Sequence, residues 1–406
     1  MTPTLLLDLD GTLLDNEIGE FLPLYLKALG KHLASHAAPD RLIPTLLTAT
    51  QEMIQNNRPD LTLKEVFEAK FFSDLNLDRE ALQTGIDEFY AEIFPGLRSH
   101  TSPRPEAITL VEYAVDCGYR IAIATNPLFP RSAILQRLEW ANLSPQDYPF
   151  SLIASYETFH FAKPNPVFFT EILARLGWPD GGVIMVGDDL YNDIYPARSI
   201  GIPTFWVAQD KNIGKDDPFT TTAQGSLGAV IPWLDSASPE QLRPDFSSTI
   251  ATTGTLRATP AALAVMIHEL PASAYNVRAK PDEWSLTEIL CHLRDVEQEV
   301  NLPRLKKVID ELDPFLPGMV TDPWAEERQY ICQDAPTALA SFTQSRLQLL
   351  NLLDGLKDED WRRTARHAIF GPTHLKELAG INAGHDRLHI QQVKKTIKMI
   401  KINKTN

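Results

Sequence analysis

Cysteine is scarce in this sequence, because Cys117, Cys291 and Cys332 are its three cysteines among 406 residues. No two of them form a CxxC pair, which excludes a disulfide-stabilised scaffold and a zinc finger built on thiolates. So few thiols are typical of a protein from a reducing compartment. We therefore expect a cytoplasmic protein.

Long apolar runs are also missing. No stretch approaches 18 uninterrupted apolar residues, whereas a membrane-spanning helix needs about 20. The N-terminal residues, MTPTLLLDLDGT, lack a basic segment, and acids interrupt their apolar run after three leucines. They do not have the pattern of a signal peptide, and we expect a protein without a membrane partner.

Positive charge is in short supply, with 38 Lys and Arg against 53 Asp and Glu and a formal net charge of −15. Residues 1–240 hold 17 basic and 32 acidic side chains, whereas residues 241–406 hold 21 of each. A field this acidic repels phosphate backbones and anionic lipid, which excludes a nucleic-acid binder. The length and the uneven charge together predict two or three domains.

The first part of the chain has the pattern of an α/β fold. Residues 4–9 form a short apolar run typical of a buried strand, and residues 18–93 carry apolar residues at helical spacing. Between residues 107 and 208, β-rich runs alternate with helical runs. This order predicts a Rossmann-like parallel sheet with an inserted helical segment, whose ligand crevice lies at the carboxyl ends of the strands.

The second part has a different pattern. Residues 208–258 are rich in Ser, Thr, Pro, Gly and Asp, and we expect a first domain over 1–237 and a linker over 238–255. Residues 256–402 contain four long amphipathic segments and no strand-like alternation. They predict an all-α four-helix bundle.

Two acids stand at the end of the first predicted strand. Asp8 and Asp10 flank Leu9, and residues two apart on a strand face the same way. Gly11 permits a tight turn after them. Two close carboxylates repel each other unless a cation lies between them, so the pair favours Mg²⁺. An isolated acid pair of this kind is more often a solvated turn.

Further polar residues follow the other predicted strands. Thr125 and Asn126 come after one strand, Lys163 precedes a helix, and Gly187, Asp188 and Asp189 follow another strand, with Asp193 four residues later. Taken one by one, these residues fit a helix cap, a surface lysine and a polar turn. Taken together, they occur in order and in the places where the crevice of such a sheet is expected.

These motifs resemble a known family. DLDGT, the Thr of ATNP, the Lys of AKPNP and GDDLYND are similar to motifs one to four of the haloacid dehalogenase (HAD) superfamily. The resemblance covers about residues 1–237, and the insert at about 16–98 resembles the helical cap of one of its subgroups.

The resemblance implies a phosphoryl-transfer site. Asp8 would be the nucleophile that becomes an aspartyl-phosphate, and Asp10 the general acid and base. Mg²⁺ would bind Asp8, the backbone carbonyl of Asp10 and Asp188, with Asp193 as a further metal candidate. Either Asp189 or Asp193 would hold a metal-bound water or orient the motif lysine.

The resemblance also implies how the substrate is bound. Thr125, Asn126 and Lys163 would contact the phosphoryl oxygens, Thr125 and Lys163 as catalytic residues, and the cap would select the substrate. A second Asp in the first motif favours phosphate-ester hydrolysis over dehalogenation, while a phosphomutase stays open. The expected partner is a small phosphorylated metabolite. Three cap residues are candidate contacts, although a helix start and core packing explain them better: Asn16, Glu20 and Phe21.

Three histidines in the second part have the spacing of a metal site. His385 and His389 are four residues apart and share a helix face, and His292 lies on an earlier helix that an antiparallel bundle could bring opposite them. Three neutral imidazoles can hold Zn²⁺, Ni²⁺ or Fe²⁺ with open positions. A lone buried histidine is usually a core residue.

The histidine-bearing segments resemble a second family. WSLTEILCHLRDVE and FGPTHLKELAGINAGHDRLHIQQV are similar to the motifs of the DinB-like four-helix bundles over about residues 256–402. The family's three metal-binding histidines align with His292, His385 and His389, and Trp284 and the turn at 370–372 also fit. We expect His367 and His374 at a turn or on the surface.

Several activities of the bundle stay open. The resemblance implies a metal-dependent thiol transferase or isomerase, a bundle that only binds metal, or one that forms a homodimer. In one alternative the bundle is the working enzyme and the HAD-like part is inactive.

Overall fold

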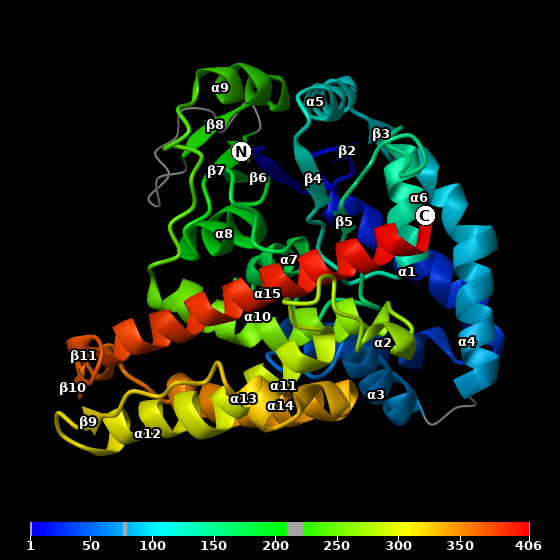
Figure 1. Ribbon diagram of the computed structural model, residues 1–406. Helices are drawn as coiled ribbons and strands as arrows, with labels where there is room; N and C mark the ends of the chain where they lie inside the picture. The colour runs from blue at the N-terminus through cyan, green and yellow to red at the C-terminus, as the bar shows by residue number, and fades with distance from the viewer. Residues whose placement is uncertain (1, 76–78, 209–221, 406) are drawn as a thin grey trace. The chain divides into compact units, whose positions relative to one another are not determined.

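The computed structural model describes residues 2–75, 79–208 and 222–405, and for 402–405 the backbone alone. The chain divides into two compact units (Figure 1). The first comprises Met1–Ile172 and Pro179–Phe246, and the second comprises Ser247–Asn406 together with Leu173–Trp178.

The first unit is built on a parallel sheet of six strands in the order β5-β4-β1-β6-β7-β8. Every residue of β1 is buried, as expected for a parallel sheet with both faces covered. The predicted α/β fold is confirmed. The strands are β1 (Thr4–Leu7), β4 (Arg120–Ile123), β5 (Leu152–Ile153), β6 (Val183–Gly187), β7 (Thr204–Val207) and β8 (Ala223–Gly225).

Helices connect these strands in the alternating order that the sequence predicted. They are α5 (Pro105–Asp116), α6 (Arg131–Trp140), α7 (Val167–Leu176), α8 (Tyr195–Ser199) and α9 (Val230–Ser236), with the short turns η4 (Leu190–Ile194) and η6 (Leu227–Ala229). Strand β8 was not expected, because its three residues lie in a segment whose composition is typical of loops.

A helical insert interrupts the first unit between β2 (Leu14–Asp15) and β3 (Ser102–Pro103), which pair as antiparallel strands. We call this insert the cap. It consists of α1 (Ile18–His32), η1 (Leu33–Ser35), α2 (Pro39–Gln55), α3 (Leu63–Leu75), α4 (Arg79–Glu88), η2 (Phe89–Ile93) and η3 (Phe94–His100). These helices occupy the part of the sequence where a helical cap was expected.

Aromatic side chains hold the cap together. The Phe21 ring packs edge-on against Phe94 at 6.3 Å, and Phe94 stacks on Trp140 of α6 at 5.1 Å. The Tyr25 and Tyr90 hydroxyls are 2.8 Å apart. Phe21 is therefore a packed core residue, as the alternative reading of the sequence had it, whereas Glu20 is exposed.

The second unit is a helical bundle, as predicted. Its long helices are α10 (Thr249–His268), α11 (Leu286–Val296), α12 (Leu302–Asp310), α14 (Ala335–Asp354) and α15 (Leu375–Thr405). The π-helical turn η8 (Glu297–Asn301) joins α11 to α12. Shorter elements are η7 (Ala272–Ala274), α13 (Trp324–Glu327), η9 (Tyr330–Cys332) and η10 (Asp360–Arg362).

Helix α10 starts earlier than the sequence suggested. The expected linker ran to Thr255, but the helix begins at Thr249, where the Ser248 side chain accepts a hydrogen bond from the Ala251 N–H at 3.0 Å. Of the Ser and Thr residues that indicated a linker, Ser248 is thus a helix cap, and Thr252 and Thr255 are buried helix positions. By length and composition α10 could cross a membrane, but most of it is buried inside the structure.

A small three-stranded sheet in the bundle unit was not predicted. It contains β9 (Phe315–Leu316), β10 (Thr364–His367) and β11 (Gly371–His374) in the order β11-β10-β9. Strands of two to four residues are too short to show a period in sequence. His374 is exposed as expected, but His367 is buried and its Nδ1 accepts from the N–H of Ile369 at 3.1 Å.

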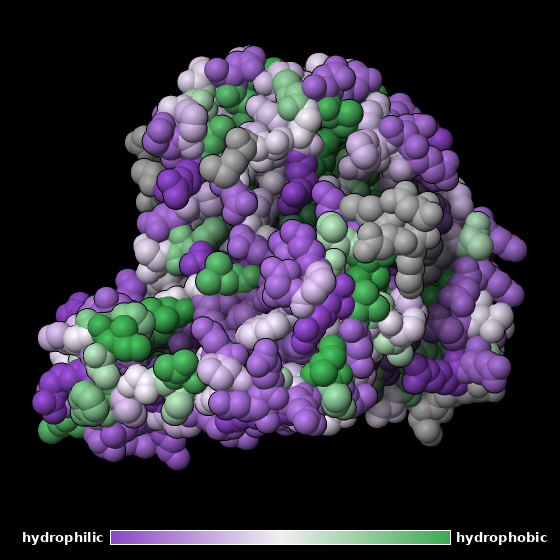
Figure 2. Space-filling view, in the orientation of Figure 1, coloured by the Kyte–Doolittle hydropathy of each residue, from purple (hydrophilic) through white to green (hydrophobic). Residues whose placement is uncertain are grey.

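Exposed apolar side chains gather around this small sheet. Figure 2 shows them as green atoms at the end of the bundle where Figure 1 places β9–β11. They include Leu312, Phe315, Val320, Ile369 and Phe370. Exposed apolar side chains do not by themselves identify a partner, so the homodimer that we expected from the sequence stays a prediction.

The interior of the bundle contains a fully paired arginine. Arg346 of α14 donates to Glu297 and Asp386 through two hydrogen bonds each, at 2.5 to 3.1 Å, and to the Leu256 carbonyl at 2.7 Å. These five bonds match the five N–H donors of a guanidinium. The network ties α14 to η8, α15 and α10, and each of its three charged residues is buried.

We expect Arg346→Met to destabilise the bundle unit by about 3–5 kcal/mol, because it leaves two buried carboxylates without a counterion. Hydrogen exchange of the α14 amides in increasing urea measures this loss. A triple variant that adds Glu297→Gln and Asp386→Asn removes the orphaned charges, and we expect it to recover most of the stability. If the single and the triple variant lose the same stability, the loss comes from the changed shape of the side chains and not from unpaired charge.

Candidate active site and metal centre

The carboxyl end of β1 carries Asp8, which is bonded to the motif lysine. Lys163 Nζ donates to Asp8 Oδ1 at 2.7 Å and to Asp193 Oδ1 at 2.5 Å, and Lys163 is 1% exposed. One carboxylate oxygen from each of Asp8, Asp188 and Asp193 lies within 4.8 Å of the others. The fold therefore brings together residues from the loops after β1 and β6 and before α7.

Two glycines leave the space that these carboxylates occupy. Gly11 has a φ of +80°, and a Cβ added there would lie 2.3 Å from Asp188 Oδ2. A Cβ added to Gly187 would lie 2.3 Å from Asp193 Oδ2. The Thr12 hydroxyl donates to Asp188 Oδ1 at 3.0 Å. Gly11 is needed for its positive φ, and both glycines allow the carboxylates to approach the backbone closely.

The charges of this cluster are not balanced. Burial and the Asp193 carboxylate raise the pKa of Asp8 to about 7, and burial and Asp8 raise the pKa of Asp188 to about 7. Burial also raises the pKa of Asp193 to about 6. Although burial opposes its charge, the carboxylates of Asp193 and Asp8 raise the pKa of Lys163. Three carboxylates share one ammonium, so a divalent cation fits the charge and the oxygen donors.

Asp10 points to different partners. Its Oδ1 accepts from Asn16 Nδ2 at 2.7 Å, and its Oδ2 accepts from Arg137 Nη1 of α6. The Arg137 guanidinium lies 4.6 Å from the centre of the Phe129 ring. Its Nε and Nη2 are buried and have no hydrogen-bond partner among the described residues. The Asp10 carboxylate thus lies outside the three-acid cluster, and its backbone contact to a metal stays a prediction.

The remaining motif residues, Thr125, Asn126 and Asp189, lie in the same pocket as Lys163. Thr125 follows β4 and is 1% exposed. The Asn126 Oδ1 atom accepts a hydrogen bond from the backbone N–H of Lys163 at 3.2 Å. The Asp189 side chain accepts from the N–H groups at the start of η4, so it caps that turn. Of the two acids left open by the sequence, Asp193 therefore contacts the lysine and Asp189 does not.

These side chains line one pocket of about 790 Å³ in the first unit. Ligand pockets commonly measure 300–1,000 Å³. The pocket contains the acids, the lysine and the threonine of the four motifs, and it also contains Arg137 and Arg104. Its lining includes Asp8, Asp10, Asn16, Thr125, Asn126, Lys163, Asp188, Asp189 and Asp193.

We predicted neither Arg104 nor Arg137 at this site, and Arg137 is the one that contacts Asp10. An arginine in an amphipathic helix is usually an exposed charge. Here it shares a face of α6 with Ala133, Ile134 and Trp140, which are all buried. Its position three and four residues from apolar neighbours was the available signal, because it places the side chain on the core side of the helix.

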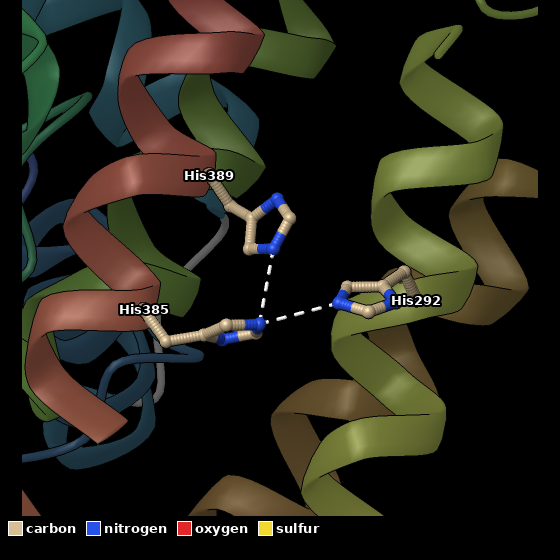
Figure 3. Close-up of side chains that lie close together, drawn as sticks. All are labelled: His292, His385 and His389. Carbon is tan, nitrogen blue, oxygen red and sulfur yellow. Dashed lines mark hydrogen bonds between the residues drawn. The ribbon is translucent and has the colours of Figure 1, made fainter. Parts of the chain in front are cut away.

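The three histidines of the bundle converge (Figure 3). His292 comes from α11, and His385 and His389 come from α15. His385 Nε2 lies 3.2 Å from His292 Nε2 and 3.1 Å from His389 Nε2. Two metal–nitrogen bonds of 2.0–2.1 Å at a tetrahedral angle place their nitrogens about 3.3–3.4 Å apart. The spacing therefore fits a shared metal ion.

The surroundings keep these imidazoles neutral. Burial and the other two histidines lower the pKa of His292 to about 3, and burial lowers the pKa of His385 and His389 to about 4. Neutral imidazole is the form that binds metal. His389 Nδ1 lies 2.9 Å from Gln392 Oε1, and the Trp284 ring is parallel to His389 at 6.2 Å. Such contacts orient a ligand ring.

Comparisons with known proteins agree with this division of the chain. Residues 2–201 match the family model for haloacid dehalogenase-like hydrolases, and residues 255–393 match that of the DinB superfamily. A phosphoglycolate phosphatase from Mesorhizobium japonicum is 28% identical over 245 residues, covering 59% of this chain and 94% of that protein. A glyceraldehyde 3-phosphate phosphatase from Pyrococcus abyssi is 31% identical over 140 residues, covering 34% of this chain and 54% of that protein.

A solved structure is also similar to part of this chain. The four-helix-bundle protein YfiT from Bacillus subtilis aligns with a TM-score of 0.35 and 20% identity, covering 41% of this chain and 91% of that one. Both resemblances drawn from the sequence motifs are confirmed by the family matches. Residues 2–201 of this chain are thus similar to the haloacid dehalogenase-like hydrolases, and residues 255–393 are similar to the DinB superfamily.

Proposed function

We propose that this protein is a Mg²⁺-dependent phosphatase of small phosphate esters that works through an aspartyl-phosphate on Asp8. One observation carries the proposal: Asp8 is held by Lys163 beside Asp188, in a pocket that also contains Thr125 and Asp10. The named phosphatase relatives, which act on phosphoglycolate and glyceraldehyde 3-phosphate, support the same class of reaction.

Asp8 supplies the nucleophilic oxygen. Its Oδ1 is held by Lys163 at 2.7 Å, so its other oxygen is left to attack the phosphorus. Asp8, Asp188 and the backbone carbonyl of Asp10 would hold the Mg²⁺, which neutralises charge on the transferring group. Thr125, Asn126 and Lys163 would hold phosphoryl oxygens as the charge develops.

Asp10 would give its proton to the leaving oxygen and later take one from water. Its carboxylate is held by Arg137 and Asn16, so these residues fix where the proton is delivered. We assign Arg137 as a positioning residue for Asp10.

We expect Arg137→Met to lower kcat by about 10- to 100-fold, because general acid–base catalysis contributes about 10²–10⁴-fold and depends on geometry. KM should change little, since Arg137 acts through Asp10 in this assignment. Steady-state phosphate release measures both constants. Arg131→Met, on the exposed first turn of the same helix, is the control. A rise in KM with unchanged kcat would make Arg137 a substrate-binding residue instead.

For the bundle we propose that His292, His385 and His389 hold a divalent ion such as Zn²⁺ or Ni²⁺. The three converging Nε2 atoms support this, and three protein ligands leave a position for a reactant. A thiol transferase, an isomerase and a metal-binding bundle stay alternatives.

An experiment distinguishes the proposed phosphatase from two other hypotheses for the first unit. A phosphomutase moves the phosphoryl group to another hydroxyl, so free phosphate does not accumulate, whereas a phosphatase releases it. An inactive first unit would release none, but the paired Asp8 and Lys163 and the intact acid cluster argue against this. The cytoplasmic location stays a prediction.

A further inference from the structure

A second cavity lies beside the catalytic pocket in the first unit. It measures about 410 Å³ and is enclosed by the cap helices and by the loop that follows β4. Ile18, Leu128 and Phe129 line both spaces. Leu128 and Phe129 lie two and three residues after Asn126, so the segment that would bind the phosphoryl group also forms part of the wall of the second cavity.

The walls of this cavity, which we call the cap cavity, are apolar. Aliphatic and aromatic side chains from all four cap helices face it, including Leu22, Leu46, Ile54, Phe67, Phe71 and Ile86. Two further lining residues, Ile18 and Leu47, are each 43% exposed. Large apolar side chains left accessible at a cavity commonly mark a ligand site.

Most of the polar groups in the wall are already paired. Glu68 forms ion pairs with Lys64 and Arg79, whereas Gln51 and Tyr156 also line the cavity. The hydroxyls of Tyr25 and Tyr90 bond to each other at 2.8 Å. The Thr50 hydroxyl donates to the Leu46 carbonyl at 2.9 Å, and Gln83 donates to Asp87 at 2.8 Å. A hydroxyl or carboxylate placed among these walls would lose its hydration for few new hydrogen bonds, which is costly. The cavity therefore favours an apolar occupant.

We infer that the cap cavity receives the apolar body of the substrate, so that the substrate is a phosphate monoester of an aliphatic or aromatic alcohol. The inference rests on the proposed phosphatase activity at Asp8. The phosphoryl group lies at the carboxyl ends of the strands, and the alcohol extends past Ile18, Leu128 and Phe129 into the cap.

The volume sets the size of this alcohol. At about 30 Å³ for a water-sized group, 410 Å³ accommodates on the order of ten methylene-sized groups. A two- or three-carbon alcohol would leave most of the cavity unfilled. The burial of each methylene is worth about 0.8 kcal/mol, which corresponds to about a fourfold change in kcat/KM.

A series of n-alkyl monophosphates from ethyl to decyl tests this in the full-length protein with Mg²⁺. We expect kcat/KM for phosphate release to rise about two- to fourfold with each added methylene and to level off when the cavity is full. A series that is flat or falls with length, while ethyl phosphate is hydrolysed, would overturn the cap-cavity inference and leave the phosphatase standing.

A pair of variants of α2 localises the effect. Thr50 lines the cavity and Thr48 is exposed and does not line it, yet both hydroxyls bond the carbonyl four residues back at 2.9 Å. We expect Thr50→Trp to remove the gain for octyl and decyl phosphate by at least tenfold while ethyl phosphate changes less than twofold. Thr48→Trp should match the unmodified protein. An unaltered series in a folded Thr50→Trp would contradict the inference.

Binding of n-alkylphosphonates, measured by calorimetry, separates the two proposals. If no ester is hydrolysed but affinity rises with chain length, the phosphatase proposal fails and the cap cavity stands as a binding site. If neither hydrolysis nor affinity depends on length, the cavity inference fails. The unmodified protein alone decides both outcomes, so neither depends on the folding of a variant.

Discussion

Replacing Asp8 by Asn is expected to lower phosphate release by at least about 10⁴-fold, because the nucleophile of a covalent mechanism has no substitute in the site. Asn keeps the shape of the side chain but has no anionic oxygen to attack phosphorus. The change also removes the charge of one of the two acids that bond to Lys163. Release of phosphate from a panel of monoesters with excess Mg²⁺ measures the effect.

The intermediate itself gives a second measurement. Rapid acid quench and mass spectrometry should find a phosphoryl group on the peptide that contains Asp8, and none in Asp8→Asn. Asp116→Asn, at the exposed end of α5, is the matched control and should behave as the unmodified protein. Turnover that persists in both Asp8→Asn and Asp8→Ala would exclude Asp8 as the nucleophile.

Replacing His385 by Ala is expected to weaken divalent-metal binding by the bundle by at least about 100-fold, since even residues that only orient a ligand contribute about 10- to 100-fold. His385 Nε2 is the atom that lies close to both other histidines, so its loss removes the middle of the set. Metal per chain, measured after dialysis against Zn²⁺ and then against buffer, reports the change.

His268→Ala provides the control for that experiment, because this histidine is exposed at the end of α10 and is distant in sequence from the cluster. We expect it to retain metal at the level of the unmodified protein. Equal metal content in His268→Ala and His385→Ala would show that the converging histidines are a packed core cluster. Phosphatase activity in the same samples reports whether the first unit depends on that ion.

Much of the fold could be predicted because its elements are periodic. The strands of the parallel sheet are apolar runs, and the bundle helices repeat apolar residues every three or four positions. The elements that were missed have no period to read. Strands β8 and β9–β11 are two to four residues long, and the start of α10 was hidden by Ser and Thr residues whose composition indicates a linker.

The site could be predicted where its residues follow strands and form short motifs. Asp8, Asp188 and Lys163 meet as expected because parallel strands end at one edge of the sheet. Arg137 and the network around Arg346 could not be found in this way. When a charged residue lies on the apolar face of a helix, the sequence pattern indicates that its side chain is buried. The pattern does not indicate its partners, which lie up to 127 residues away in sequence, as in the pair of Asp10 and Arg137. Only the packed fold brings such partners together.

The antiparallel pairing of β2 and β3 has a consequence for how the cap can change. The chain leaves the sheet through Leu14–Asp15 and returns through Ser102–Pro103, and these two strands are hydrogen-bonded to each other. The ends of the cap are therefore already side by side, so lengthening or exchanging what lies between them adds little loop-closure entropy to the folding of the sheet. The cap can diversify as an interchangeable module while the catalytic edge of the sheet stays the same.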